Sequence, residues 1–251
     1  ANLSPNVPSI VRPQRFFETL IYTGTATGSG TQTISDLEFA PDFVWIKSRA
    51  IGYSHLLVDT VRGASKGLLS ESTDVEETSN GYGMVTAFES NGFTMTRGSN
   101  DGGKCCEDTQ TYVAWCWKAG GAAVTNNDGT KSVTLSANQE AGFSIITFDG
   151  NDANATIGHG LGKKPKFFVV KSRTHSQNWF VYHVVTGATK NPRLNDTAAP
   201  YTTANIWNNT EPTDTVINLG LSSGVNGNGN SYICYCWAEI PGYSKFGSYE
   251  G

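Results

Sequence analysis

The chain is poor in charged residues and has no long apolar run. Only 16% of its 251 residues are Asp, Glu, Lys or Arg, against about 25% in an ordinary soluble domain. The 18 basic and 22 acidic residues give a net charge of −4 and form no basic stripe, so we expect no nucleic-acid partner. No stretch approaches the ~18 consecutive apolar residues of a membrane-spanning helix, so we expect no insertion into a membrane.

Sequence motifs of common catalytic and metal sites are also missing. There is no Gly-x-Ser-x-Gly elbow and no His-Glu-x-x-His helix. The five cysteines have no zinc spacing, and Cys116 and Cys236 lie in apolar segments, which predicts small buried thiols. His55 and Asp59 could share one face of a strand and serve acid–base chemistry, although such a pair is more often a surface hydrogen bond. We predict no enzymatic activity, no cofactor and no metal site, and a calcium ion in the acidic loops stays an open alternative.

The residues that replace the missing charge are typical of short strands and turns. Glycine alone accounts for 28 positions, and clusters such as 99–103 (Ser-Asn-Asp-Gly-Gly) mark turns that need a positive φ. Tyr112–Trp117 carries apolar groups on both faces and predicts a central strand. Further strands of the first half are predicted at 17–22, 43–47, 54–58, 85–88 and 92–96.

Three sequence blocks occur twice in the same order. Proline, phenylalanine, two apolar residues and Lys-Ser-Arg at 41–49 recur at 165–173, an offset of 165 − 41 = 124. Segment 17–24 matches 143–150, and 112–117 matches 232–237. Blocks that keep their order while their offset drifts slowly indicate a tandem duplication of one module. A duplicated surface suits multivalent binding better than a catalytic site, which needs unlike groups converging on one place.

The repeat divides the chain into two modules, and the regular short strands and turn signals of each module indicate its fold class. We predict an all-β fold of two tandem antiparallel β-sandwich-like modules related by internal duplication. The predicted parts are an extended arm at 1–15, module 1 at 16–119, a linker hairpin at 120–141 and module 2 at 142–241. Residues 242–251 resemble the opening of a module, so we expect either the start of a third repeat or a tail that adds a strand to module 2 or to a neighbouring subunit.

Aromatic residues in polar loops are the candidate ligand contacts. Trp207 lies among Asn205, Asn208 and Asn209, and Trp179 follows the polar run 174–178. An indole face flanked by amides suits a sugar, whose apolar face stacks while its hydroxyls form hydrogen bonds. The alternative is that each tryptophan anchors its loop. We take Trp207, Asn205, Asn208, Asn209 and Trp179 as the tentative glycan-binding residues.

Several of these blocks resemble a repeat domain of tail-fibre-like virion proteins of marine bacteriophages, cyanophages among them. The resemblance rests on residues 39–49, 55–63 with Asp59-x-x-Arg62-Gly63, 112–121, 158–162 and 242–249. It implies a virion surface protein, made in the bacterial cytoplasm and acting outside it, with other virion proteins and a host-surface glycan or receptor as partners and a homo-oligomeric state. A purely structural virion protein, for capsid decoration or as a fibre spacer, is the alternative. A glycan depolymerase is a third possibility.

Overall fold

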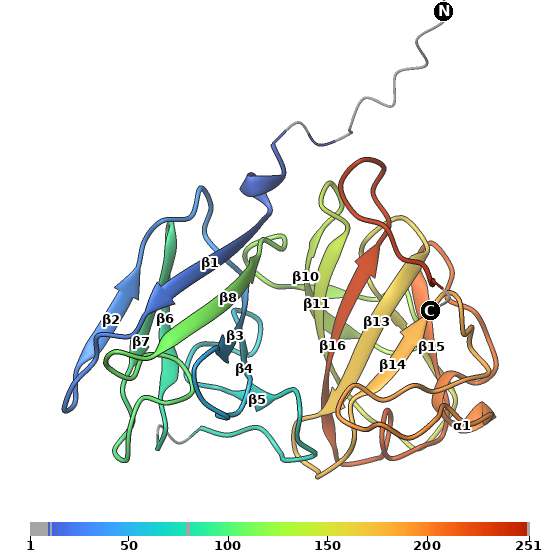
Figure 1. The fold of residues 1–251 in the computed structure, drawn as a ribbon. Helices are drawn as coiled ribbons and strands as arrows, with labels where there is room; N and C mark the ends of the chain where they lie inside the picture. The colour runs from blue at the N-terminus through green and yellow to red at the C-terminus, as the bar shows by residue number, and fades with distance from the viewer. Residues whose placement is uncertain (1–9, 11, 79–80, 250–251) are drawn as a thin grey trace, which may run out of the picture.

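The regular structure of the chain is almost all antiparallel β-sheet (Figure 1), which confirms the all-β prediction. The computed structural model describes residues 10, 12–78 and 81–249, so most of the arm expected at 1–15 lies outside the described residues. After a 3₁₀ turn at Pro13–Arg15, the first half contains β1 (Phe17–Thr23), β2 (Thr31–Ile34), β3 (Phe43–Ser48), β4 (Leu56–Asp59), β5 (Leu68–Leu69), β6 (Met84–Glu89), β7 (Gly92–Thr96) and β8 (Thr111–Trp117). The second half contains β9 (Val124–Asn126), β10 (Val133–Asn138), β11 (Phe143–Asp149), β12 (Ala155–Gly158), β13 (Pro165–Ser172), β14 (Phe180–His183), the short helix α1 (Ala204–Trp207), β15 (Val216–Leu219) and β16 (Ser231–Ala238).

Strand β8 illustrates how the apolar pattern determines the sheets. Tyr112, Ala114 and Cys116 alternate along one face and are fully buried, while Trp115 and Trp117 on the other face are half-buried. Alternation with period two places each set on one side of the sheet. β8 lies between β1 and β3, as the prediction of a central strand required.

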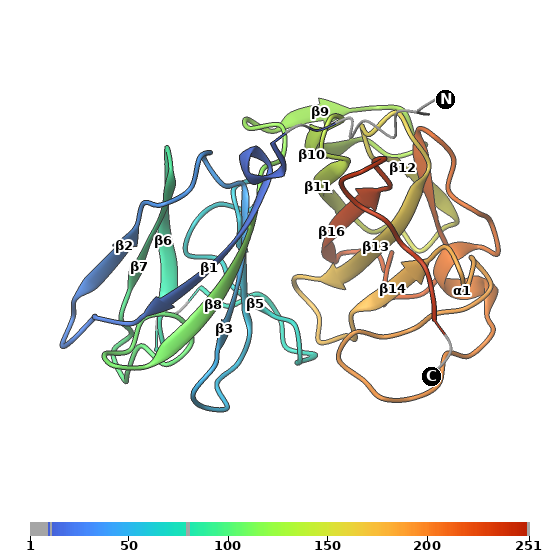
Figure 2. The same ribbon diagram turned by 45° about the horizontal axis from the view of Figure 1, so that its top comes forward.

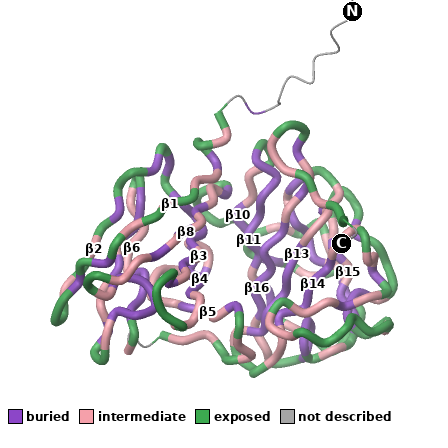
Figure 3. The backbone as a smooth tube through the Cα atoms, in the orientation of Figure 1, coloured by how far each residue is buried: buried purple, intermediate pink, exposed green. Residues whose placement is uncertain are grey.

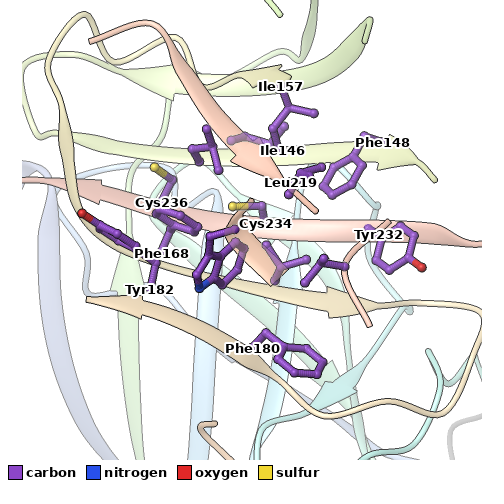
Figure 4. Close-up of a cluster of buried hydrophobic side chains, with 14 of the residues drawn as sticks. Ile146, Phe148, Ile157, Phe168, Phe180, Tyr182, Leu219, Tyr232, Cys234 and Cys236 are labelled. Atoms are coloured by element: carbon purple, nitrogen blue, oxygen red, sulfur yellow. The ribbon is translucent and has the colours of Figure 1, made fainter. Parts of the chain in front are cut away.

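Each half contains a larger and a smaller sheet. In the first half, a five-stranded sheet in the order β1-β8-β3-β4-β5 packs against the three-stranded sheet β2-β7-β6. In the second half, a six-stranded sheet in the order β14-β13-β16-β11-β10-β9 packs against the pair β12-β15. Figure 4 shows the core of the second half, where Ile146, Phe168 and Cys234 of the larger sheet meet Ile157 and Leu219 of the smaller one.

The two larger sheets also pack against each other, so the molecule has four layers with the smaller sheets outside (Figure 1). Phe43 of β3 stacks on Tyr235 of β16 with ring centroids 4.3 Å apart, and Trp117 meets Trp237 edge-on at 6.0 Å. The buried positions gather along these facing strands (Figure 3). The halves therefore share one apolar interface in addition to their separate cores.

A buried ion pair lies within this interface. The Arg62 guanidinium donates through Nε to Asp59 at 2.5 Å, and both side chains are fully inaccessible to solvent. The hydroxyl of Tyr235 donates to Asp59 at 2.8 Å and accepts from Arg62 at 3.1 Å. Because the hydroxyl and the ion pair come from different halves, these bonds fix the register of one larger sheet on the other. This places Asp59 and Arg62, which the sequence resemblance had singled out, in an interface role.

Glu76 extends the same network to the edge of the second half. Its carboxylate accepts from Arg62 at 3.1 Å and from two nitrogens of Arg173 at 2.9 and 3.0 Å. Burial alone would raise the pKa of Glu76, but the hydrogen bonds and charges of Arg173 and Arg62 outweigh that effect and lower it. Glu76 is therefore held as an anion between two cations from different halves.

The larger sheets share a strand order and a register. The orders β1-β8-β3-β4 and β11-β16-β13-β14 correspond element by element. Phe17 and Phe43 both pair with Trp117, and Phe143 and Phe167 both pair with Trp237. The smaller sheets differ, because the second half has the loop around α1 where the first half has β6.

The hairpin within 120–141 packs differently from what the sequence predicted, and the tail does not add a strand to module 2 in the part that is described. The hairpin within 120–141 is not a separate linker, since β10 lies beside β11 and pairs with it (Figure 2). Val133 and Leu135 of β10 are buried in the core of the second half. The tail adds no strand in the part that is described, up to Tyr249. It turns back at Ile240–Ser244 and then lays Phe246 on Phe167, with centroids 6.0 Å apart. Close glycine and serine residues favour this turn over an extended strand.

Candidate binding sites

The two tryptophans expected to bind ligand are buried. Trp207 is 1% exposed and meets Phe168 edge-on at 4.9 Å in the core of the second half. Trp179 is 0% exposed, and its indole Nε1 donates to the Leu69 carbonyl of the first half at 2.9 Å. Neither indole presents a face to a ligand, which corrects the expectation from sequence: Trp207 anchors its loop and Trp179 anchors the interface.

The three asparagines around Trp207 form the turn that buries it. Asn208 and Asn209 have positive φ angles of 51° and 48°, and the amide of Asn208 closes the end of α1 on Ala204. The carbonyl of Asn205 accepts from the amide of Ser222 at 2.9 Å. Asn205 and Asn209 are exposed and Asn208 is half-buried, whereas the indole of Trp207 between them is buried. The described structure does not assemble the predicted stacking site.

A different hollow, which we call the aromatic groove, is lined by residues of both larger sheets and of the tail. Its volume is about 450 Å³, within the range of ligand sites. The aromatic side chains that line it are Phe17, Trp45, Trp117, Phe167, Trp237, Tyr243 and Phe246. Polar groups are few: among the lining residues, only Lys245 carries a charge. The groove therefore suits an apolar group better than a polyhydroxylated one.

A second hollow combines aromatic and polar side chains. This tyrosine pocket has a volume of about 340 Å³ and lies on the first half. It is lined by Gly52, Tyr53, Ser54, Leu69, Glu77, Tyr82 and Lys104. Tyr82 is 46% exposed, so part of this side chain is accessible to a ligand. Rings beside a carboxylate, an ammonium and a hydroxyl match the needs of a sugar.

The polar groups of the tyrosine pocket are held in place. Lys104 is buried, and its Nζ forms an ion pair with Glu77, whose side chain is 25% exposed. The hydroxyl of Tyr53 donates to Asp101 at 2.7 Å. The Tyr53 ring lies directly on Gly103, where a Cβ atom would come within 2.2 Å of the ring. The pocket is therefore preformed, which lowers the entropy cost of binding. Its residues are spread from 52 to 104, so no local sequence pattern could have identified it.

His55 has neighbours that could suggest nucleophilic catalysis. Its Nδ1 lies 3.3 Å from the Ser70 hydroxyl and 3.8 Å from the Glu71 carboxylate. A catalytic triad needs the nucleophile and the acid on opposite ring nitrogens, whereas here both approach the same one. Asp59, which the sequence allowed on the same strand face, is instead buried against Arg62.

The cysteines and the remaining ionisable groups show no assembled metal site. All five cysteines are free and buried, which confirms the prediction for Cys116 and Cys236, and burial raises the pKa of both thiols. Within residues 10, 12–78 and 81–249, no group of three or more His, Cys, Asp or Glu side chains is placed to hold a metal ion. In the same residues, no helix has the length and apolarity needed to cross a membrane.

Comparison with known protein families finds a match that covers almost the whole chain. Residues 12–251 match the family described as domain of unknown function DUF7483. Neither the curated proteins nor the solved structures contain a match. The matched region includes both halves, their shared interface and both hollows. The chain belongs to the DUF7483 family.

Proposed function

We propose that this chain is a non-catalytic binding module of a bacteriophage virion surface, of the tail-fibre type, and that it engages a host-surface glycan. The observation that carries the proposal is the tyrosine pocket, in which the part-exposed side chain of Tyr82 lines the same hollow as the ion pair of Glu77 and Lys104. The phage context rests on the sequence resemblance. The all-β architecture, with its binding surface on loops around a rigid sheet, is compatible with it.

The chemistry of the tyrosine pocket fits a saccharide for three reasons. The exposed part of the Tyr82 side chain offers a stacking surface for the apolar face of a sugar ring. Glu77 accepts and Lys104 donates, so vicinal hydroxyls find partners of both kinds. The volume of about 340 Å³ is at the lower end of ligand sites and suits one or two sugar rings.

A glycan array with the purified chain tests this proposal, followed by titration of the best binder into variants. We expect Tyr82→Ala to weaken binding by about 2 kcal/mol, roughly thirtyfold, because it removes the stacking face. Tyr201→Ala is the matched control, since Tyr201 is also 46% exposed but lies far along the chain in the second half. An equal loss of glycan affinity in both variants, or no glycan binding on the array, would contradict a glycan site in this pocket.

The aromatic groove favours the alternative, a purely structural virion protein whose aromatic residues contact other virion chains. Its apolar lining resembles the core of a protein interface more than a sugar site. In that case the chain would self-associate or bind virions without binding glycan, and Trp237→Ala would weaken the association. Release of sugar from host polysaccharide during the same assays would instead indicate a depolymerase.

We further propose that module 1 at 16–119 and module 2 at 142–241 are two sandwich modules derived from one ancestor by tandem duplication, and that β9 and β10, which precede residue 142, extend the larger sheet of module 2. The shared strand order and the pairing of two phenylalanines with one tryptophan in each half support this. Under this proposal the loops have diverged more than the sheets, and the tyrosine pocket is a feature of module 1 alone. Expressing residues 12–119 by themselves would test whether one half folds independently.

A further inference from the structure

Strand β1 is an edge strand in the first half, whereas its counterpart β11 is an interior strand. Among the strands of the described residues, β1 pairs with β8 alone, while β11 pairs with β16 on one side and with β10 on the other (Figure 1). Because the larger sheets share order and register, the free side of β1 corresponds to the side of β11 that β10 covers. The first half has no counterpart of β10 among its described residues.

Because β1 lacks this neighbour, its side chains are more exposed than those at the matching positions of β11. Ile146 and Phe148 of β11 are 0% and 5% exposed, and they share a core with Val133 and Leu135 of β10. Leu20 and Tyr22 occupy the matching positions of β1, since the two strands pair in the same way with β8 and β16. Both are only partly buried. Ile21, between them, is 66% exposed.

The backbone of β1 is also incompletely paired. Gly24 donates to Gln110 and Lys118 donates to Phe16, so the even-numbered residues of β1 form the hydrogen bonds with β8. The N–H groups of Thr19 and Ile21 therefore point away from β8. No described strand lies on that side to accept from them. An apolar edge with free backbone groups is a ready template for strand addition.

We propose that the free edge of β1 binds an extended segment of another polypeptide that has the chemistry of β10. That segment would run antiparallel to β1 and place aliphatic residues at alternate positions, as Val133 and Leu135 do in β10. These residues would cover Leu20 and Tyr22 as β10 covers Ile146 and Phe148. The added strand would complete a sheet whose counterpart is already complete within the chain.

The probe for this inference is a labelled peptide with the sequence of residues 131–140, which contains β10. We expect saturable binding to the full chain by fluorescence anisotropy, and slower amide hydrogen exchange at Thr19 and Ile21. A peptide with serine at the positions of Val133 and Leu135 should bind at least about tenfold more weakly, because it loses the buried aliphatic groups.

A variant of β1 separates strand addition from other modes of binding. Ile21→Pro removes an N–H that β8 does not use, so it should weaken peptide binding about tenfold while the chain stays folded. Ile21→Thr, which copies Thr147 of β11, is the matched control and should keep binding. If Ile21→Pro unfolds the chain, hydrogen exchange of the unaltered protein tests the proposal instead: slower exchange at Thr19 and Ile21 with peptide supports strand addition at β1, and unchanged exchange there contradicts it.

Three results would overturn the inference. The first is no peptide binding at millimolar concentration. The second is slowed exchange confined to β11, which would mean that the peptide only displaces its parent strand. The third is self-association of the chain without peptide that Ile21→Pro abolishes, which would assign the edge to β1 of a second copy. None of these results bears on glycan binding in the tyrosine pocket.

Discussion

Phe43 and Tyr235 stack across the interface between the halves, with ring centroids 4.3 Å apart and an interplanar angle of 23°. The Tyr235 hydroxyl continues past the stack and bonds to Asp59 and Arg62. One residue thus belongs to the apolar and to the ionic part of the interface. The ring supplies buried area, and the hydroxyl satisfies charges that would be costly to bury unpaired.

Replacing Tyr235 by phenylalanine separates these two contributions. Tyr235→Phe keeps the stack on Phe43 but removes a hydroxyl that satisfies a buried carboxylate and a buried guanidinium. We expect the free energy of unfolding to fall by about 1–3 kcal/mol, measured by urea denaturation. Tyr249→Phe is the control, since Tyr249 is 94% exposed and its hydroxyl should contribute less than about 0.5 kcal/mol. Equal stability of both variants would show that the ion pair does not need the hydroxyl.

Glu76 should make the interface sensitive to acid. Its pKa in the folded chain is lowered from 4.5, because Arg173 and Arg62 outweigh the effect of burial. Its contribution to stability is complete above pH 4.5 and is lost as the pH falls through the lower folded value, because the unfolded chain then binds more protons. Glu76→Gln should lower the melting temperature at pH 7 and flatten its decline in acid.

The control for this pH series is Glu38→Gln. Glu38 also pairs with an arginine, Arg12 at 2.6 Å, but their side chains are 47% and 62% exposed. An exposed pair contributes little, so this variant should follow the parent curve. Parallel pH curves for the parent and Glu76→Gln would contradict the interface role of the carboxylate.

Trp207 should behave as a core residue. Trp207→Ala removes a ring that is 1% exposed and packed on Phe168, so we expect a loss of about 3–5 kcal/mol in the free energy of unfolding. Glycan affinity of the folded fraction should not change. Asn205→Ala, an exposed position on the same helix, should alter neither quantity. Weaker glycan binding by Trp207→Ala with unchanged stability would instead support the ligand-binding site that the sequence predicted at Trp207.

Much of the sheet architecture was predictable because it depends on local alternation. The apolar positions of Tyr112, Ala114 and Cys116 predict β8 and its central place, and the repeated proline–phenylalanine block predicts where β3 and β13 begin. The burial of Trp207 was not predictable, because it depends on contact with Phe168 in a distant strand. Polar neighbours suggested an exposed loop, whereas the asparagines form the turn that directs the indole inward.

Contacts between the halves could not be predicted from the sequence either, because they too depend on strands that are far apart along the chain. Phe43 lies in the repeated block at 41–49 and Tyr235 in the one at 232–237, and nothing local shows that the two side chains meet each other instead of solvent. The tyrosine pocket likewise joins Tyr53, Glu77 and Lys104 from separate loops. The described tail forms no strand within this chain although its sequence resembles that of β11, and its addition to a neighbouring subunit stays a prediction. β11 is held between β10 and β16, and the described tail has no such neighbours.

Phe246 should act as a partial cover of the aromatic groove. Its ring lies parallel to that of Phe167, at an interplanar angle of 8°, and is itself half-buried. Phe246→Ala should expose apolar groove surface at little cost in melting temperature, because the tail forms no strand with the sheet. We expect the fluorescence of the apolar dye ANS to increase with this variant, while Tyr249→Ala, at an exposed position of the same tail, leaves it unchanged. A large loss of stability without added dye binding would instead make Phe246 part of the core.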